Sequence, residues 1–145
     1  MPTASFTKVN DFVEALAEKV HNLGSDQLVV ALSNTAPGSE SNDPTADGNG
    51  VLANVTQISY TNLSSRNITT NASVQASGTY KLTLTDLVLT ASGDVGPFRY
   101  VYIYNDTATN DELIAVFDYG SSITLHNGET LTIDFDGTNG VLTVA

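Results

Sequence analysis

Hydrophobic residues recur at helical spacing in only one part of the chain, close to its beginning. This pattern predicts an amphipathic helix over residues 11–22. Asp11 and Glu14 have the spacing of a capping box, so we expect Asp11 to accept hydrogen bonds from the first-turn amides. Gly24 is the expected C-terminal stop. The apolar stripe consists of Phe12, Val13, Leu16, Val20 and Leu23.

Most of the remaining chain alternates between apolar and polar residues, as β-strands do. Residues 27–33 are apolar on both faces, so this strand is expected to be covered on both sides. Farther along the chain, apolar residues occupy even-numbered positions over 80–84 and odd-numbered positions over 87–91. This change predicts a break between two strands near Thr85 and Asp86. Further strands are expected at 55–60, 68–75, 80–84, 87–91, 98–104, 113–119, 121–125, 129–136 and 141–145.

The turn at residues 126–128 allows two registers. A two-residue turn would mix apolar and polar residues on each face. A three-residue loop places Ile123 opposite Leu131 and puts Gly128 in the left-handed position, so we prefer it provided that the two flanking strands pair.

Together these elements predict a mainly β protein: a single-domain antiparallel β-sandwich, jelly-roll-like, with one N-terminal α-helix, spanning residues 1–145. Two segments stand apart. Residues 34–50 are an acidic loop, and a loop of this length is usually functional or disordered. Residues 48–80 contain no acid and a single base, Arg66, which suggests exposed strands or an arm that lies against a partner.

Charge and composition exclude several classes of function. The 145 residues include 16 acids and 5 bases, a net charge of −11, with no Cys and no Trp. A disulfide scaffold and a Cys-ligated metal site are excluded. A nucleic-acid partner is not expected, because phosphate binding needs clustered Lys and Arg. No apolar run is long enough for a membrane span, so no membrane partner is expected.

The residues offer little for catalysis. His21 and His126 are far apart, the G-x-S-x-G motif is absent, and we expect both histidines to lie on the surface. No catalytic residue and no cofactor is predicted, and the protein is not expected to be an enzyme.

Calcium is the metal that the acids would suit best. Asp134 and Asp136 begin a segment that starts like an EF-hand loop, but its twelfth position is Ala145 rather than Glu. Glu40, Asp43 and Asp47 form a second acidic group. The alternative for both groups is ordinary turn chemistry, because Asp, Asn and Gly are also the residues that turns require.

The strand 98–104 is the most distinctive local feature, with an aromatic residue at every second position. Val101 lies on its opposite face and is expected to point into the core. The aromatic face is either an inter-subunit surface or one side of a strand that is buried on both sides. The candidate interface residues are therefore Arg66, Tyr100, Tyr102 and Tyr104.

Two stretches resemble a family of small virion structural proteins of tailed bacteriophages. The first is residues 6–37, FTKVNDFVEALAEKVHNLGSDQLVVALSNTAP, with its HNLGSD and ALSNTAP motifs. The second is residues 77–119, with GPFRY followed by YND, and residues 120–145 also resemble the family. The resemblance is weakest over 38–71.

This resemblance implies a capsid decoration, or cement, protein. Such a protein is made in the host cytoplasm and sits on the outer surface of the virion capsid as a homotrimer. It binds the major capsid protein and stabilises the head. A tail or head–tail (neck) structural protein is the alternative within the virion, and a calcium-dependent carbohydrate-binding β-sandwich is the alternative outside it.

Overall fold

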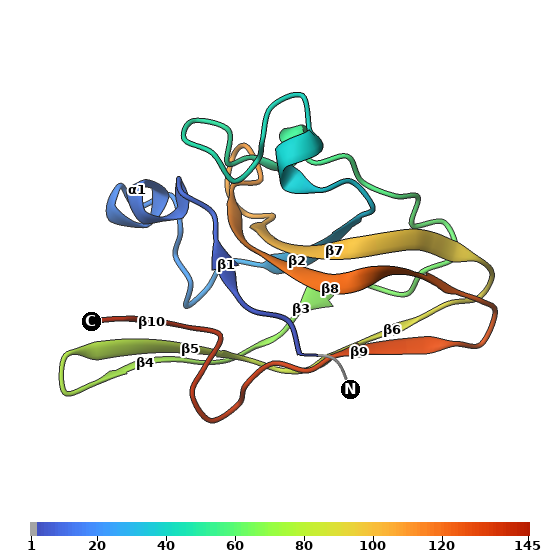
Figure 1. Cartoon of the computed structure of the whole chain (residues 1–145). Coiled ribbons are helices and arrows are strands. Elements are labelled where there is room, and N and C mark those ends of the chain that lie inside the picture. Colours follow the sequence, from blue (N-terminus) through green and yellow to red (C-terminus); the bar gives the residue numbers. More distant parts are fainter. Residues whose placement is uncertain (1–2) are drawn as a thin grey trace.

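Antiparallel strands stack in two layers in the computed structural model, which describes residues 3–145 (Figure 1). The upper layer is a five-stranded sheet, in the order β1 (Thr7–Lys8), β8 (Leu113–Leu125), β7 (Val95–Asn105), β2 (Leu28–Ser33) and β3 (Asn67–Ile68). The lower layer consists of two smaller sheets: β10 (Leu142–Val144), β5 (Thr79–Leu84) and β4 (Thr70–Ala76), and then β6 (Leu87–Thr90) with β9 (Thr130–Ile133). The predicted antiparallel β-sandwich with one N-terminal helix is confirmed.

The main hydrophobic core lies between these layers. Aliphatic side chains from the upper sheet meet side chains from both lower sheets, and the most deeply buried are at most 1% exposed. Burying this apolar surface is the principal force that holds the layers together. Representative members are Val30, Leu82, Leu89, Ile103 and Ile114.

A second apolar cluster covers the opposite face of the upper sheet. The segment from residue 34 to residue 56, with short 3₁₀-helices at Pro37–Ser39 and Leu52–Asn54, passes above β2 and β7 (Figure 1). Val55, Leu52 and Ala36 from this segment pack on the sheet. All six residues of β2 are consequently buried, which confirms a strand covered on both sides.

The helix α1 is shorter than predicted, spanning Phe12–Ala17 rather than 11–22. Lys19 adopts a left-handed conformation with φ of 68°. The amide of Val20 donates to the carbonyl of Ala15 at 2.8 Å, and the amide of Lys19 donates to Leu16 at 3.4 Å. These two bonds form a Schellman motif, in which the amides of Lys19 and Val20 satisfy the last carbonyls of the helix. The helix therefore ends before Gly24, the predicted stop.

The break near Thr85 and Asp86 is confirmed, because β5 and β6 belong to different sheets on either side of it. The three-residue loop at 126–128 was preferred on the condition that its flanking strands pair with each other, and this condition is not met. β8 pairs with β7, and β9 pairs with β6, so the turn links the two layers instead of closing a hairpin. Gly128 does have the predicted positive φ, 84°. Residues 113–125 form one strand, and residues 55–60 form none.

Candidate interaction surfaces and polar clusters

The aromatic face of β7 is buried within the chain. Tyr100, Tyr102 and Tyr104 are 9%, 0% and 5% exposed, and the segment above the sheet covers them. The strand is therefore buried on both sides, and these tyrosines form no exposed inter-subunit surface. The inter-subunit alternative was wrong because the segment 34–56, whose position the sequence pattern does not predict, packs on this face.

Arg66 supports the fold beside β2. Its Nη1 donates to the carbonyl oxygen of Val30 at 2.6 Å, and the Val30 amide donates to the Arg66 carbonyl at 3.0 Å. The guanidinium also lies 3.7 Å from the centre of the Tyr60 ring, a cation–π contact. Arg66 is half-buried, and its guanidinium is engaged by contacts within the chain.

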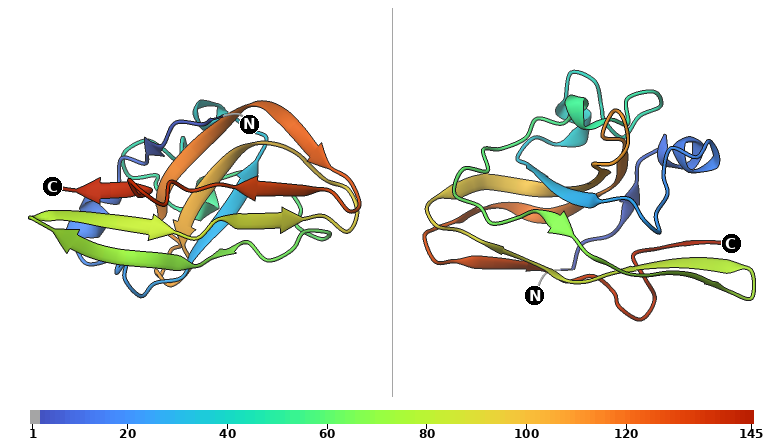
Figure 2. Two further views of the ribbon diagram at one scale, coloured as in Figure 1. Left: turned by 90° about the horizontal axis from the view of Figure 1, so that it is seen from below. Right: turned by 180° about the vertical axis from the view of Figure 1, so that it is seen from behind.

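The acid-free segment, residues 48–80, carries a single charge, that of the half-buried Arg66, and its exposed side is called the acid-free surface below. It runs down the back of the sandwich, from the loop above the upper sheet through β3 to β4 (Figure 2, right). Its exposed side chains are mostly short amides and hydroxyls, which can be desolvated at a lower cost than charges. They include Gln57, Ser59, Thr61, Ser64, Ser65, Asn67, Thr69, Asn71 and Gln75.

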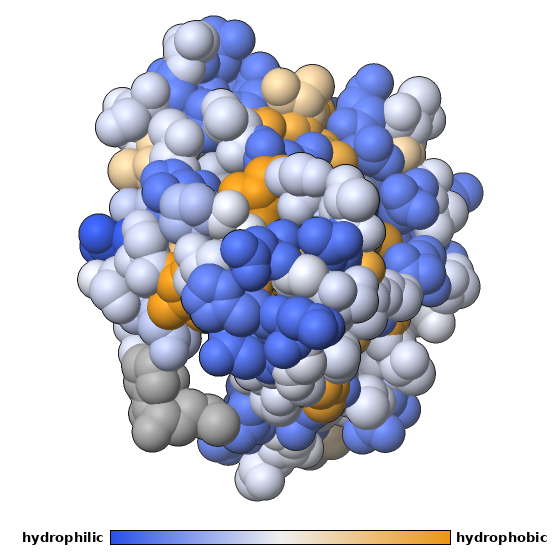
Figure 3. Space-filling view, turned by 90° about the vertical axis from the view of Figure 1, so that its right-hand side faces the viewer, coloured by the Kyte–Doolittle hydropathy of each residue, from blue (hydrophilic) through white to orange (hydrophobic). Residues whose placement is uncertain are grey.

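The side of the molecule at the right of Figure 1 carries few apolar residues on its surface. Hydrophilic residues cover most of it, and apolar residues surface only in small patches (Figure 3). Such a face is typical of ordinary solvated protein surface.

The carboxylates of the acidic loop accept hydrogen bonds from the chain's own backbone and side chains. Glu40 accepts hydrogen bonds from the Thr56 amide at 2.9 Å and the Thr56 hydroxyl at 2.5 Å. Asp43 accepts from the amide and the hydroxyl of Thr45, at 2.9 and 2.7 Å. Asp47 accepts from the Asn10 side chain at 3.0 Å. The Asp43 bonds stabilise a turn within the loop, and the Glu40 and Asp47 bonds attach the loop to neighbouring parts of the chain.

Asp134 and Asp136 border a cleft of about 620 Å³ between β8 and β9. The Asp136 carboxylate accepts hydrogen bonds from the amides of Thr138 and Asn139 and from the Asn139 side chain, at 2.8–2.9 Å. These bonds hold the pKa of Asp136 below its usual value. Within residues 3–145, no three or more His, Asp or Glu side chains gather as metal ligands do. The Asp136 carboxylate stabilises the turn that contains Thr138 and Asn139.

His21 belongs to a buried polar cluster, and its predicted surface position is wrong. Its side chain is 5% exposed, and its Nδ1 lies 3.0 Å from Asn105 Nδ2. Asn105, which is fully buried, also donates to Asp26 at 2.6 Å. The Asn105 oxygen accepts from the amides of Thr107 and Ala108, which fixes the orientation of the side-chain amide.

That orientation determines the tautomer of His21. Because the Asn105 amide nitrogen donates, His21 Nδ1 is the acceptor and Nε2 carries the proton. No described residue accepts a hydrogen bond from Nε2, which is buried. Burial lowers the pKa of His21, while the carboxylates of Glu112 and Asp26 raise it less. His21 is therefore neutral near pH 7 and holds the α1–β2 connection against the end of β7.

His126 lies on the surface, as predicted. Its Nδ1 is 2.8 Å from Asp94 Oδ1, and both side chains are largely exposed. This contact raises the pKa of His126. Neither histidine is hydrogen-bonded to a described Ser or Thr hydroxyl, so no Ser–His arrangement forms within residues 3–145.

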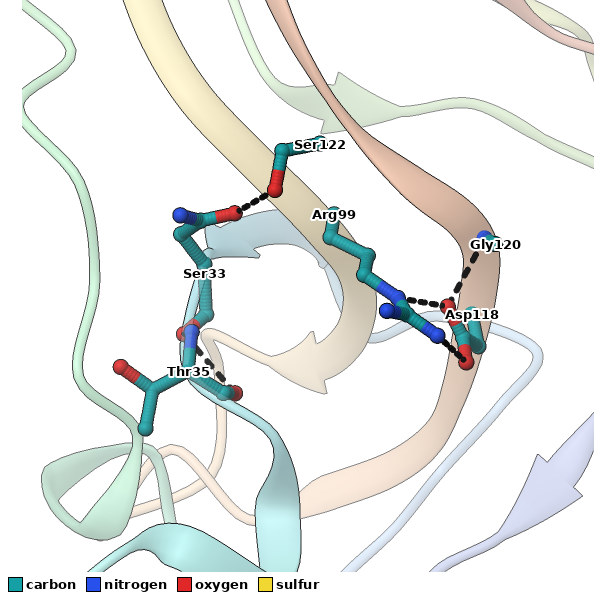
Figure 4. A network of polar contacts seen from close by, with 7 residues as sticks. Ser33, Thr35, Arg99, Asp118, Gly120 and Ser122 are labelled. Carbon is teal, nitrogen blue, oxygen red and sulfur yellow. Dashed lines mark hydrogen bonds and ion pairs between the residues drawn. The ribbon is translucent and has the colours of Figure 1, made fainter.

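A polar network lies where β8 deviates from regular pairing with β7 (Figure 4). Arg99 donates two hydrogen bonds to Asp118, at 2.7 and 2.9 Å. Asp118 also accepts from the amide of Gly120 at 2.8 Å, while Ser122 donates to Asn34 at 2.6 Å. The bonds from Arg99 and Gly120 lower the pKa of Asp118, and together with the Ser122–Asn34 bond they hold the irregular part of β8 against its neighbours.

Sequence analysis missed the projecting hairpin of β4 and β5, which extends beyond α1 at the left of Figure 1. Its turn, Ser77 and Gly78, has positive φ at both residues, as a two-residue type I′ turn requires. The sequence SG, flanked by short alternating segments, was the available signal.

Comparison with protein families, with curated proteins and with solved structures finds no match for this chain. Over residues 3–145, no helix has the length and apolar character needed to cross a bilayer.

Proposed function

We propose that this protein is a phage capsid decoration protein, which binds the outer surface of the major capsid protein shell and stabilises the head. The observation that carries the proposal is the acid-free surface on a chain of net charge −11. A partner can cover this surface without burying carboxylates, which would cost several kcal/mol each on the order-of-magnitude scale for buried ions. The remaining acidic surface keeps the free protein soluble before assembly.

The sequence resemblance to phage virion proteins supports the same proposal, since its motifs extend over both ends of the sandwich. The polar clusters support it as well. The carboxylates of the acidic loop, Asp136 and His21 all bond to the chain's own backbone or side chains. A structural role needs no reacting group, and repeated weak contacts over a shell add up through multivalency.

Binding to capsids that lack decoration protein tests the proposal directly. We expect the purified chain to sediment with such capsids and to raise the temperature at which they release DNA. The Asn67→Glu/Thr69→Glu variant places acids on the acid-free surface and should weaken capsid binding at least about tenfold, which corresponds to about 1.4 kcal/mol.

Thr132→Glu is the matched control, because Thr132 is exposed on β9, away from the acid-free surface. It should bind like the parent chain. Failure of the parent chain to bind, or equal losses in both variants, would refute the proposal. Labelling in intact particles separates head from neck: even coverage of the head fits decoration, and a spot at one vertex fits the neck alternative.

A further inference from the structure

The strand β4 is the longest unpaired edge in the lower layer. It lies at the outer margin of its sheet, paired only with β5 (Figure 2, left). The edges of the upper sheet are two-residue strands, and β10 has three residues, whereas β4 has seven. β4 has no charged residue and no Pro, the usual devices that block pairing at an edge.

The hairpin register determines which backbone groups of β4 are open. Ala76 pairs with Thr79 across the two-residue turn, so this pair exchanges hydrogen bonds. Hydrogen-bonded pairs alternate along an antiparallel ladder, and Val74 with Lys81 is therefore the next such pair. The amides of Ser73 and Gln75 consequently point outward, away from β5.

The apolar side chains of β4 lie on its outer face, whereas a strand that covers a core has its apolar side chains on the inner face. Ala72, Val74 and Ala76 share one face, and Val74 is 53% exposed. On the other face, Ser73 bonds to the Tyr80 hydroxyl at 2.8 Å. The apolar stripe of β4 (Ala72, Val74 and Ala76) is thus directed away from the layers of its own sandwich.

Charge and symmetry favour a second copy as the occupant of this edge. Two chains of net charge −11 repel each other in most relative orientations. Contact through the acid-free segment, which contains β4, avoids this repulsion because it brings no carboxylates of that segment together. Lys81, which pairs with Val74 across the hairpin, donates to the Thr138 carbonyl at 2.8 Å. The stripe is also self-complementary, because a two-fold axis at its centre sets apolar residues opposite apolar residues.

We propose that β4 pairs antiparallel with β4 of a second copy about a two-fold axis at Val74. In this register the two Val74 side chains are directly opposite, and Ala72 lies opposite Ala76 of the other copy. Ser73 and Gln75 exchange backbone hydrogen bonds across the interface. One strand pair is a small contact, so the dimer is expected at high protein concentration.

The inference concerns the isolated chain and does not depend on capsid binding. A two-fold pair also differs from the homotrimer that the sequence resemblance implies, so the measured mass distinguishes the two. Failure of this pairing would leave the capsid proposal untouched, and failure to bind capsids would leave this pairing untouched.

Cysteine cross-linking tests the register, since the chain has no Cys of its own. Opposed residues of a non-hydrogen-bonded antiparallel pair have Cα atoms about 4.5 Å apart, within disulfide range. The Val74→Cys variant should therefore form a covalent dimer under mild oxidation. Val88→Cys is the matched control, because Val88 is 51% exposed on β6, and it should cross-link far less.

Hydrogen exchange on the parent chain provides a second measurement without a substitution. The amides of Ser73 and Gln75 should exchange rapidly at low concentration and become protected as the concentration rises, together with a mass of two chains. The amides of Ala72 and Val74 should be protected throughout. The proposal is overturned by a monomer or trimer mass at high concentration, by unchanged exchange at Ser73 and Gln75, or by equal cross-linking of the two variants.

Discussion

The carboxylate of Asp11 accepts a hydrogen bond from the amide of Gly50 at 2.8 Å, across 39 positions of sequence. Its other oxygen accepts from the amide of Gly48, also at 2.8 Å. A Cβ at Gly50 would lie only 2.9 Å from the Asp11 carboxylate and 3.0 Å from Val9, so this approach requires glycine. Asp11 thus fastens the end of the acidic loop beside the start of α1.

Replacing Asp11 by Asn should loosen this loop. The amide nitrogen of Asn would face a backbone N–H, so one of the two charge-assisted bonds is lost, at about 1–3 kcal/mol. Denaturant unfolding should show the loss, and limited proteolysis should cut residues 38–50 faster. The control is Asp47→Asn, whose exposed bond to Asn10 should change stability by no more than about 0.5 kcal/mol. Equal effects in both variants would contradict the fastening role.

Removing the hydroxyl of Tyr102 should not destabilise the protein. This oxygen is buried and finds no hydrogen-bond partner among the described residues, and burial raises the pKa of Tyr102. Tyr102→Phe should therefore be neutral or stabilising by up to about 1–3 kcal/mol, since the unsatisfied group is removed. Thermal unfolding measures the change.

Tyr60→Phe provides the contrast. The Tyr60 hydroxyl accepts from the Leu32 amide at 2.9 Å and donates to Gln57 at 2.7 Å. Its removal should cost about 1 kcal/mol or more. A larger loss of stability in Tyr102→Phe than in Tyr60→Phe would show that the Tyr102 hydroxyl is hydrogen-bonded in solution.

Arg66 should matter for stability more than Arg99. Arg66→Ala removes a bond to the Val30 carbonyl and the contact with Tyr60, and should cost about 1–3 kcal/mol. Arg99 forms an exposed ion pair with Asp118, so Arg99→Ala should destabilise the protein less than Arg66→Ala does. Denaturant unfolding of both variants checks the order, and the reverse order would contradict the supporting role of Arg66.

The free energy of unfolding should fall as the pH decreases below about 6.5, because of His21. Burial lowers the pKa of His21 in the folded state, so the unfolded chain binds more protons over this range. The contribution of His21 is therefore fully present above the ordinary pKa and is lost as the pH falls toward the lowered folded-state pKa. Above about pH 7 the profile should be level with respect to this group.

His126 acts in the opposite direction and must be removed to isolate the effect. Its pKa is raised by Asp94, so its contribution is present at low pH and is lost as the pH rises through that value. Between about pH 5 and 6.5 the His126→Gln variant should show the fall caused by His21 at least as steeply as the parent chain, and His21→Gln should show none over this range. Below about pH 5 the lowered pKa values of Asp118 and Asp136 add their own loss of stability in every variant. A level profile in His126→Gln would contradict the buried position of His21.

How far the sequence predicted the structure depended on the range of each interaction. The strand 27–33, the break at Thr85 and Asp86 and the left-handed Gly128 follow from spacing and parity alone, and all three are confirmed. Strand period and turn chemistry are local properties, so neighbouring residues suffice to define them.

Other predictions failed where a distant partner competed for the same group. The Asp11 carboxylate has the spacing of a capping box, yet it bonds to the amides of Gly48 and Gly50 instead of the first turn of α1. His21 lies near a helix end, yet Asn105, 84 positions later, draws it into the interior. A sequence pattern does not contain the position of such partners.

The sequence by itself determined the β-sandwich class, the strand faces and the absence of acids over residues 48–80. Only the tertiary structure decided that a loop covers the tyrosines of β7 while the edge of β4 stays open. Both faces of a strand with apolar residues on each side can be buried, and the chain's long-range packing selects what covers each one. That selection is made by contacts between segments far apart in sequence, where local periodicity has no influence.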